Sequence, residues 1–143
     1  MPFMVHVTRR EIEKSFRKHK SFVRHLNQSG RYASPQRKMI LFYAVECGLK
    51  SLYMKRKCLQ RTDQKDSNNK SVSDFSHNLN RLLKKLNLIQ HKLPDVMAVD
   101  SISIPAKSLH EAWRYGKELD AYDERKYEEK LQKIMQIIDR ELK

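Results

Sequence analysis

The stretch from Met39 to Arg56 constrains the fold more than any other feature, because it is apolar on most sides of a helix. At helical spacing, one face carries Leu41, Val45, Leu49 and Leu52. Much of the remaining surface is also apolar, through Phe42, Tyr43, Ala44 and Met54. A surface helix shows one apolar stripe, whereas a helix that is apolar on most sides is enclosed by other elements. We therefore predict that this stretch is the central helix of an all-helical domain.

The central helix also contains a charged pair and a glycine. Glu46 and Lys50 are spaced i to i+4, the orientation in which an acid and a base attract across one turn, and we predict an ion pair at the edge of the core. Gly48 weakens a helix interior by roughly 0.5–1 kcal/mol relative to alanine. Its expected use is to let a neighbouring backbone come close.

Capping signals predict where the first two helices begin. Thr8 and Glu11 form a capping box, which starts a helix from about Arg9 to Asn27. Ser34 supplies an N-cap for the central helix, with Pro35 at the first helical position. The apolar positions expected in the first helix are Ile12, Phe16, Phe22, Val23 and Leu26.

Two later segments show an apolar stripe of helical period. A third helix is expected over roughly Phe75 to His91, with the stripe Leu79, Leu82, Leu83, Leu86 and Ile89. A final helix is expected from about Asp123 to Leu142, with the stripe Tyr127, Leu131, Ile134, Ile138 and Leu142. Between them, Ser108 to Tyr115 is expected to form a short helical turn that ends at Gly116, whereas Val96 to Ile104 fits no single element.

These elements predict an all-α bundle of four to five helices in a single domain, residues 1–143. Residues 1–7 form a tail of strand-like composition that either pairs with another segment or stays loose. Residues 60–73 are polar and predict a flexible loop.

The charge balance points to an acidic partner. Lys and Arg number 30 against 17 Asp and Glu, a net charge of +13, which favours nucleic acid, an anionic membrane surface or an acidic protein. The sequence has no apolar run of about 18 residues, so we expect no membrane span. Cys47 and Cys58 are expected to be the reduced thiols of a cytoplasmic protein.

Three segments occur in a characteristic order. Tyr43 to Lys55 reads YAVECGLKSLYMK, His77 to Leu86 reads HNLNRLLKKL, and Trp113 to Gly116 reads WRYG ahead of the last helix. This order resembles the HEPN family, helical domains of prokaryotic toxin–antitoxin, antiphage and CRISPR-associated systems. The resemblance covers about Tyr32 to Leu142. It implies a bundle of four or five helices that is frequently dimeric, so a homodimer or a place in a larger complex is expected.

Many members of that family are metal-independent ribonucleases, whose signature is an arginine, four to six intervening residues and a histidine. None of the six histidines here follows an arginine at that spacing. The resemblance therefore implies a binding or regulatory module. A non-standard catalytic site is the alternative, in which His77 acts as general base and Arg81, at i+4, holds a phosphate. In the simpler interpretation, His77 packs at the N-terminus of a helix.

The first helix presents a basic outer face, and basic residues recur elsewhere. If these surfaces merge, they follow a phosphate backbone. The candidate nucleic-acid-binding residues are Arg9, Arg10, Lys14, Arg17, Lys18, Arg24, Arg56, Lys57 and Arg114.

Trp113 is expected to anchor the core or a dimer, with base stacking as the alternative. The histidines lack companions at metal-ligand spacing and no glycine-rich phosphate loop occurs, so neither metal nor cofactor is expected.

Three functions remain open. The first is a HEPN-like module of a prokaryotic defence or toxin–antitoxin system that binds RNA, expected over DNA, or a nucleic-acid-bearing partner complex. The second is a metal-independent endoribonuclease with a non-standard site, and the third is an adaptor for an acidic protein. The missing arginine–histidine spacing favours the first and third functions, whereas the positive charge favours the first two.

Overall fold

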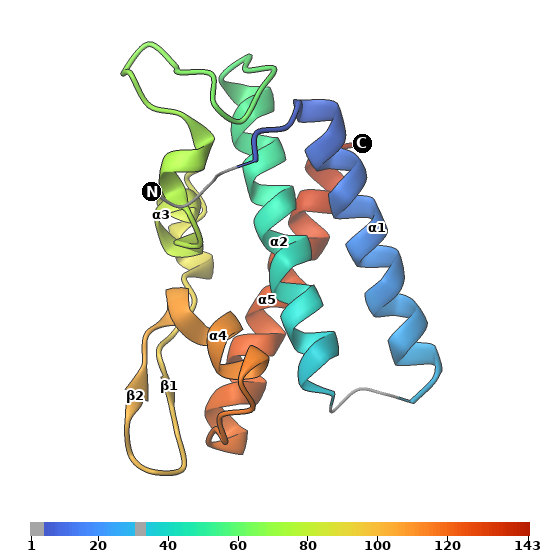
Figure 1. Ribbon diagram of the computed structural model, residues 1–143, viewed down its shortest axis with the longest axis vertical. Helices are drawn as coiled ribbons and strands as arrows, with labels where there is room; N and C mark the ends of the chain where they lie inside the picture. The colour runs from blue at the N-terminus through green and yellow to red at the C-terminus, as the bar shows by residue number, and fades with distance from the viewer. Residues whose placement is uncertain (1–4, 31–33) are drawn as a thin grey trace.

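The computed structural model describes residues 5–30 and 34–143, and it is an all-α bundle, as predicted. Three long helices make its body: α1 (Arg9–Gln28), α2 (Pro35–Arg56) and α5 (Ala121–Glu141). The short helices α3 (Leu79–Lys85) and α4 (Leu109–Arg114) lie on the other side of α2 from α1. In Figure 1, α2 runs through the middle of the molecule and α5 passes behind it. The prediction of a central helix is therefore confirmed.

The predicted caps form in the structure. Thr8 accepts a hydrogen bond from the Glu11 amide, and the Glu11 carboxylate accepts one from the Thr8 amide, which completes the capping box of α1. Ser34 accepts from the Arg37 amide and Pro35 occupies the first helical position of α2. Local side-chain chemistry thus determines where both helices begin.

Helix α2 is buried on most of its circumference, and Gly48 shows why a small residue is needed there. A Cβ atom at Gly48 would lie 2.7 Å from Cγ2 of Ile138 on α5 and 2.9 Å from Cδ1 of Phe16 on α1. The close neighbours are therefore side chains, not the backbone expected from the sequence. Glycine at this position lets both long helices pack against α2 at once.

The outer helices follow their predicted stripes with three exceptions, of which the first is Leu26 on α1, which is only half-buried. Ile12, Phe16 and Val23 are buried on α1, but Phe22 is 48% exposed because it lies on the solvent side of the helix. Four residues of α5 are fully buried, namely Tyr127, Leu131, Ile134 and Ile138. Leu142 follows the end of α5 and is only half-buried. Helix α5 begins at Ala121, earlier than predicted, because Asp120 caps it by accepting from the Asp123 amide.

The single third helix predicted over Phe75 to His91 is wrong. The segment is instead a 3₁₀ helix η1 (Val72–Phe75), the helix α3, and a 3₁₀ helix η2 (Ile89–His91). Ser76 and Asn87 interrupt it with φ angles of 50° and 60°, which a continuing α-helix does not allow. Ile89, predicted to be buried, is consequently 47% exposed.

The segment that the sequence left unassigned is an antiparallel hairpin. Strand β1 (Val96–Met97) pairs with β2 (Ser103–Ile104), with Val96 opposite Ile104. A 3₁₀ helix η3 (Ala106–Ser108) then leads into α4, which ends before Gly116 (φ 72°), so the predicted helical turn is confirmed.

The predicted tail and loop touch one another. The amide of Thr62 donates to the carbonyl of Val7 (2.8 Å), and Thr8 and Arg61 form an isolated antiparallel bridge. The segment just before α1 therefore pairs with the start of the polar loop, whereas residues 1–4 of the predicted tail lie outside the described residues. The flexibility of residues 60–73 stays a prediction.

Within residues 5–30 and 34–143, no helix has the length and apolar character to cross a membrane.

Candidate functional site

A buried carboxylate on α2 is the starting point of the site. Glu46 is almost fully buried, and its Oε2 atom accepts hydrogen bonds from Lys50 Nζ (3.2 Å) and His77 Nδ1 (2.8 Å). The predicted Glu46–Lys50 ion pair is therefore confirmed, and it has a third member. Burial acts to raise the pKa of Glu46, but the hydrogen bond from His77 and the charges of Lys50 and His77 outweigh it and lower the pKa below its usual 4.5. Glu46 is thus a fixed negative charge behind the His77 ring.

The prediction that His77 and Arg81 share one helix is wrong, but the fold still brings them to one pocket. His77 precedes α3 because Asn78 is the N-cap of that helix. The pocket lies between the region of α3 and α4 and has a cavity volume of about 380 Å³. Its lining comprises Asp74, Phe75, Ser76, His77, Asn78, Arg81, Lys107, Ser108, His110 and Glu111. We call this the histidine pocket.

The histidine pocket contains a second imidazole, that of His110 on α4, which no sequence signal identified. The ring centroids of His77 and His110 are 4.3 Å apart, and His110 also stacks on Phe42 of α2 at 4.8 Å. His110 is only 3% exposed, yet its Nδ1 atom has no hydrogen-bond partner among the described residues. Its Nε2 atom lies 4.0 Å from Glu111 Oε1, which is beyond hydrogen-bond distance.

Burial decides the protonation of His110. It lowers the pKa of the imidazole below its usual 6.5, and the charge of the neighbouring His77 lowers this pKa further. A neutral His110 beside a His77 that faces a carboxylate gives two imidazoles in unlike environments. Such a pair can donate hydrogen bonds to an anion or exchange protons with it.

The low pKa of His110 predicts a loss of stability in mild acid. The unfolded chain takes up this proton near pH 6.5 and the folded chain only at a lower pH, so the free energy of unfolding should fall as the pH drops below about 6.5. Burial lowers the pKa of His19 as well, so His19 should also lower the free energy of unfolding as the pH drops. Denaturant titrations between about pH 7.5 and 5.5 measure this effect, and it should shrink in His110→Phe. Stability that rises on acidification over this range would contradict the assignment.

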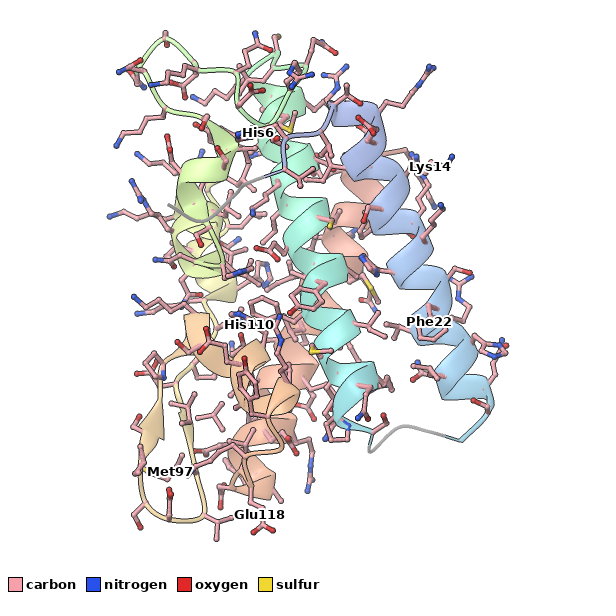
Figure 2. The ribbon with its side chains drawn as sticks, viewed as in Figure 1. His6, Lys14, Phe22, Met97, His110 and Glu118 are labelled. Atoms are coloured by element: carbon pink, nitrogen blue, oxygen red, sulfur yellow. The ribbon has the colours of Figure 1, made fainter. Side chains whose placement is uncertain are left out.

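The outer face of α1 forms a second candidate surface. Five side chains are exposed on this helix, namely Arg10, Lys14, Arg17, Lys18 and Arg24, and we call them the basic face. Phe22 is exposed on the same helix, and Figure 2 shows it and Lys14 pointing away from the bundle. Within residues 5–30 and 34–143, the one ion pair made by the basic face joins Arg17 to Glu13 at 4.0 Å. Arg9, also predicted to bind nucleic acid, is half-buried.

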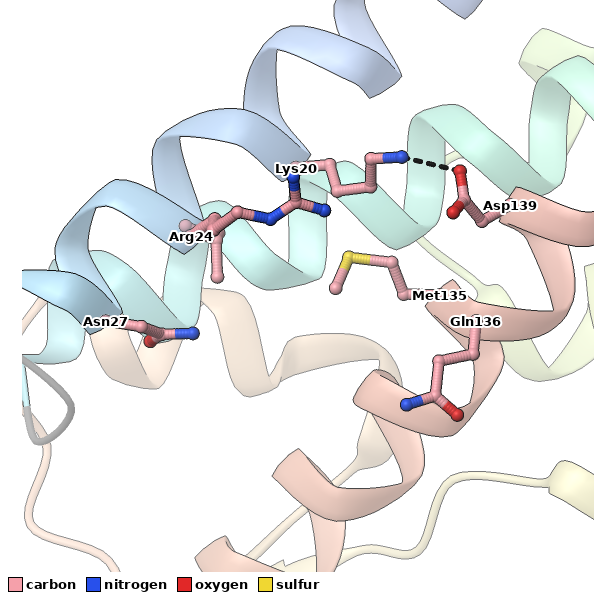
Figure 3. A pocket seen from close by; sticks show the side chains of 7 residues that line it. Lys20, Arg24, Asn27, Met135, Gln136 and Asp139 are labelled. Carbon is pink, nitrogen blue, oxygen red and sulfur yellow. Dashed lines mark hydrogen bonds and ion pairs between the residues drawn. The ribbon is translucent and has the colours of Figure 1, made fainter.

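One edge of the basic face borders a groove between α1 and α5. Figure 3 shows Lys20 in this groove, bound to Asp139, with Arg24 beside it. The groove has a cavity volume of about 230 Å³ and is also lined by Met135 and Gln136. Lys20 is therefore neutralised by α5, whereas Arg24 remains available at the rim.

The other predicted nucleic-acid-binding residues lie outside α1. Arg56 donates to the Leu86 carbonyl (2.7 Å) and Lys57 lies 6.0 Å from the Tyr53 ring, both at the end of α2. Arg114 belongs to α4, on the opposite side of α2 from α1, and its guanidinium donates to the Tyr43 hydroxyl. Arg114 is therefore apart from the basic face, whereas Arg56 and Lys57 lie at the end of α2 that adjoins the start of α1.

Trp113 is a core residue. It is 4% exposed, its indole N–H donates to Glu124 Oε2 (2.9 Å), and its ring packs edge-on against Tyr127. A ring enclosed in this way neither stacks on bases nor anchors a second subunit. Tyr115, two residues later, is the exposed aromatic of this segment.

Fold and site together define an all-helical bundle with a basic face on one outer helix and a pocket of two imidazoles across the central helix. Among the described residues, no group of three or more His, Cys, Asp or Glu side chains is placed to hold a metal ion. Comparisons with protein-family models, curated proteins and solved structures find no match to this chain. The likeness to the HEPN family thus depends on the three sequence motifs alone.

Proposed function

We propose that this chain is a HEPN-like helical module that binds RNA through the basic face of α1, in a prokaryotic defence or toxin–antitoxin system. The observation that carries the proposal is the exposure of five cations along one helix with a single, long ion pair among them. Cations that are not held by protein carboxylates can replace the counterions condensed on a phosphate backbone. The net charge of +13 adds long-range attraction for such a polyanion.

The geometry of the basic face suits an extended strand. From Arg10 to Arg24 the helix rises by roughly 21 Å at about 1.5 Å per residue, a length that passes several successive phosphates. Arg10, Lys14 and Arg17 follow one another three or four residues apart along the first turns of the helix, and Lys18 lies four residues after Lys14. The phosphate backbone of an RNA strand that lies along α1 would thus meet a cation at nearly every turn of the helix.

Phe22 favours single-stranded RNA over a duplex. Its ring is half exposed beside the basic residues, with the His25 ring at 6.4 Å. An exposed aromatic ring next to cations offers a stacking surface for an unpaired base, worth roughly 1–3 kcal/mol per base. The bases of a duplex are already stacked and offer no such contact.

A charge-neutralising variant tests the proposal. In Lys14→Gln/Arg17→Gln/Lys18→Gln, affinity for single-stranded RNA should fall, and the slope of log affinity against log salt should decrease by roughly 0.7 for each phosphate that the variant no longer neutralises, about 2 in total. The free energy of unfolding should stay within about 0.5 kcal/mol of wild type, because these side chains are exposed. Fluorescence anisotropy with labelled single-stranded RNA and duplex DNA measures affinity and salt slope, and denaturant titration measures stability.

The matched control removes the same charge from another surface. Lys84, Lys85 and Lys92 are exposed on or after α3, and their triple glutamine variant should bind RNA with nearly wild-type salt dependence. Equal losses of affinity in the two triple variants would show that net charge alone attracts the RNA. If neither RNA nor duplex DNA binds at low ionic strength, an adaptor for an acidic protein becomes the better description.

A second candidate, metal-independent RNA cleavage, has one specific observation in its favour. His77 and Arg81 line the same pocket, and Glu46 occupies Nδ1 of His77, so Nε2 is left for a substrate. Against it, Arg81 packs over the Phe75 ring at 5.4 Å instead of pairing with His77. Cleavage of RNA in the presence of chelator, abolished in His77→Ala without unfolding, would establish this activity.

A further inference from the structure

We propose that the histidine pocket binds a phosphate monoester, with His77 and His110 as hydrogen-bond donors and with Arg81 and Lys107 as the flanking charges. Figure 2 shows His110 and Lys14 on different sides of α2, so this site is separate from the basic face. The proposal therefore goes beyond RNA binding and does not depend on it.

The imidazole of His110 is buried with an unpartnered nitrogen, Nδ1. Buried polar groups nearly always have a hydrogen-bond partner, and one without a partner calls for a functional explanation. The buried Nδ1 atom of His110 has no hydrogen-bond partner among the described residues, although the side chain is almost completely enclosed. An acceptor that enters the pocket would supply the missing hydrogen bond.

The rings of His77 and His110 lie side by side in the pocket. Two rings whose centroids are 4.3 Å apart repel each other when both are protonated, unless an anion lies against them. Glu46 orients His77 through Nδ1 at 2.8 Å, so its Nε2 is the nitrogen left for a ligand. A phosphate group has three terminal oxygens that accept hydrogen bonds, so it suits two donors from different elements.

Charged side chains also line the histidine pocket. Arg81 from α3 and Lys107 from η3 line the pocket, and neither forms an ion pair within residues 5–30 and 34–143. Asp74 and Glu111 also line it, but the Asp74 carboxylate accepts from the Ser71 amide and so caps η1. The carboxylate of Glu111 lies 4.0 Å from His110 Nε2. Arg81, Lys107 and the two imidazoles thus give the pocket four side chains that can donate hydrogen bonds to an anion.

The backbone at Ser76, directly before His77, adopts an uncommon conformation. Its φ of 50° and ψ of −125° belong to a region that residues with a Cβ rarely adopt. Such conformations concentrate at ligand-binding sites, where the surrounding structure imposes them. Here the conformation turns the chain between η1 and α3 and places His77 beside Glu46.

The depth of the pocket selects a monoester. The deepest donor, His110, is almost fully buried, so only a terminal group can reach it. A phosphodiester carries a sugar on both sides and would remain at the rim. A monoester has a second pKa of about 6, so near neutral pH it is mostly a dianion and can share a proton with an imidazole.

Isothermal titration calorimetry with inorganic phosphate, with adenosine 5′-monophosphate and with adenosine tests the site. Both phosphates should bind and adenosine should not. His110→Phe and Arg81→Gln should each weaken phosphate binding roughly tenfold or more, the usual effect of removing a hydrogen bond to a charged group. Lys84→Gln, on the same helix as Arg81 but outside the pocket, should bind like wild type.

His110→Phe distinguishes a binding role from a structural one. Phenylalanine keeps the ring that stacks on Phe42 and removes the imidazole nitrogens, so its unfolding free energy should equal or exceed that of wild type while phosphate binding weakens roughly tenfold or more. His110→Leu serves the same purpose if the larger ring does not fit. A destabilised fold in both variants with phosphate binding intact would overturn the proposal.

The source of the phosphate follows from comparing ligands. Equal affinities for inorganic phosphate and the nucleotide mean that the phosphate alone is recognised, whereas tighter nucleotide binding identifies a nucleotide or an RNA 5′ end. An RNA oligomer with a 5′ phosphate should bind more tightly than its 5′-hydroxyl counterpart, and the basic-face triple variant should keep that difference. Absence of binding by every phosphate monoester at millimolar concentration would refute the site and leave the basic face untouched.

Discussion

Replacing Leu49 by alanine is expected to lower the free energy of unfolding by roughly 2–5 kcal/mol. Leu49 is fully buried in the middle of α2 and belongs to the main hydrophobic cluster. The substitution removes apolar packing and leaves a cavity that the three long helices, packed closely at Gly48, have little freedom to fill. Urea or guanidinium titrations followed by circular dichroism give the value.

The control for Leu49→Ala is Ile89→Ala. The sequence pattern predicts that both residues are buried, but Ile89 is 47% exposed on η2. Its substitution should change the free energy of unfolding by less than about 0.5 kcal/mol. Equal effects of the two variants would mean that α2 is not the centre of the bundle.

Replacing Arg37 by alanine is expected to cost about 3–5 kcal/mol, because it breaks a buried ion pair and leaves one charge without its partner. Arg37 is 1% exposed near the start of α2. Its guanidinium donates to the Asn27 side chain at the end of α1 and to the Glu128 carboxylate on α5. One side chain therefore links all three long helices.

Two control variants separate the loss of stability caused by breaking the Arg37 ion pair from that caused by removing any positive charge. Arg125→Ala removes an exposed arginine of α5 and should change stability by less than about 0.5 kcal/mol. In Arg37→Met/Glu128→Leu both charges are gone, so part of the stability should be recovered. A single variant at Arg37 that is as stable as Arg125→Ala would show that the pair is not formed in solution.

The candidate site is visible in the sequence only in part. Spacing identifies Glu46 with Lys50 as a pair and singles out His77 and Arg81. It does not identify His110, because a lone histidine in a short helix has no local pattern and meets His77 only when α4 packs on α2. A pocket assembled from distant segments has no signature in the sequence.

Exposure along α1 differs from the sequence prediction at Phe22. Composition places this residue in the core because hydrophobic residues usually lie inside. Its neighbour Val23 already occupies the buried side of the helix, so Phe22 turns toward solvent. The basic face consequently has an exposed aromatic side chain beside it.

Properties that depend on neighbouring residues can be read directly from the sequence. The nearly continuous apolar surface of Met39 to Arg56 makes α2 central, and the capping residues Thr8 and Ser34 determine where α1 and α2 begin. The residues of each such signal lie within one or two helical turns, so a short stretch of sequence is enough to recognise it. They are sufficient for the all-α class and for the basic outer face.

Which distant groups meet depends instead on how the helices pack. The positive φ angles at Ser76 and Asn87 break the leucine-rich segment because packing against α2 outweighs its helical pattern. The same packing buries Arg37 against α5 and sets the imidazole of His110 beside that of His77. Burial, and with it the cost of an unpartnered polar atom, is a property of the whole bundle and not of any one segment.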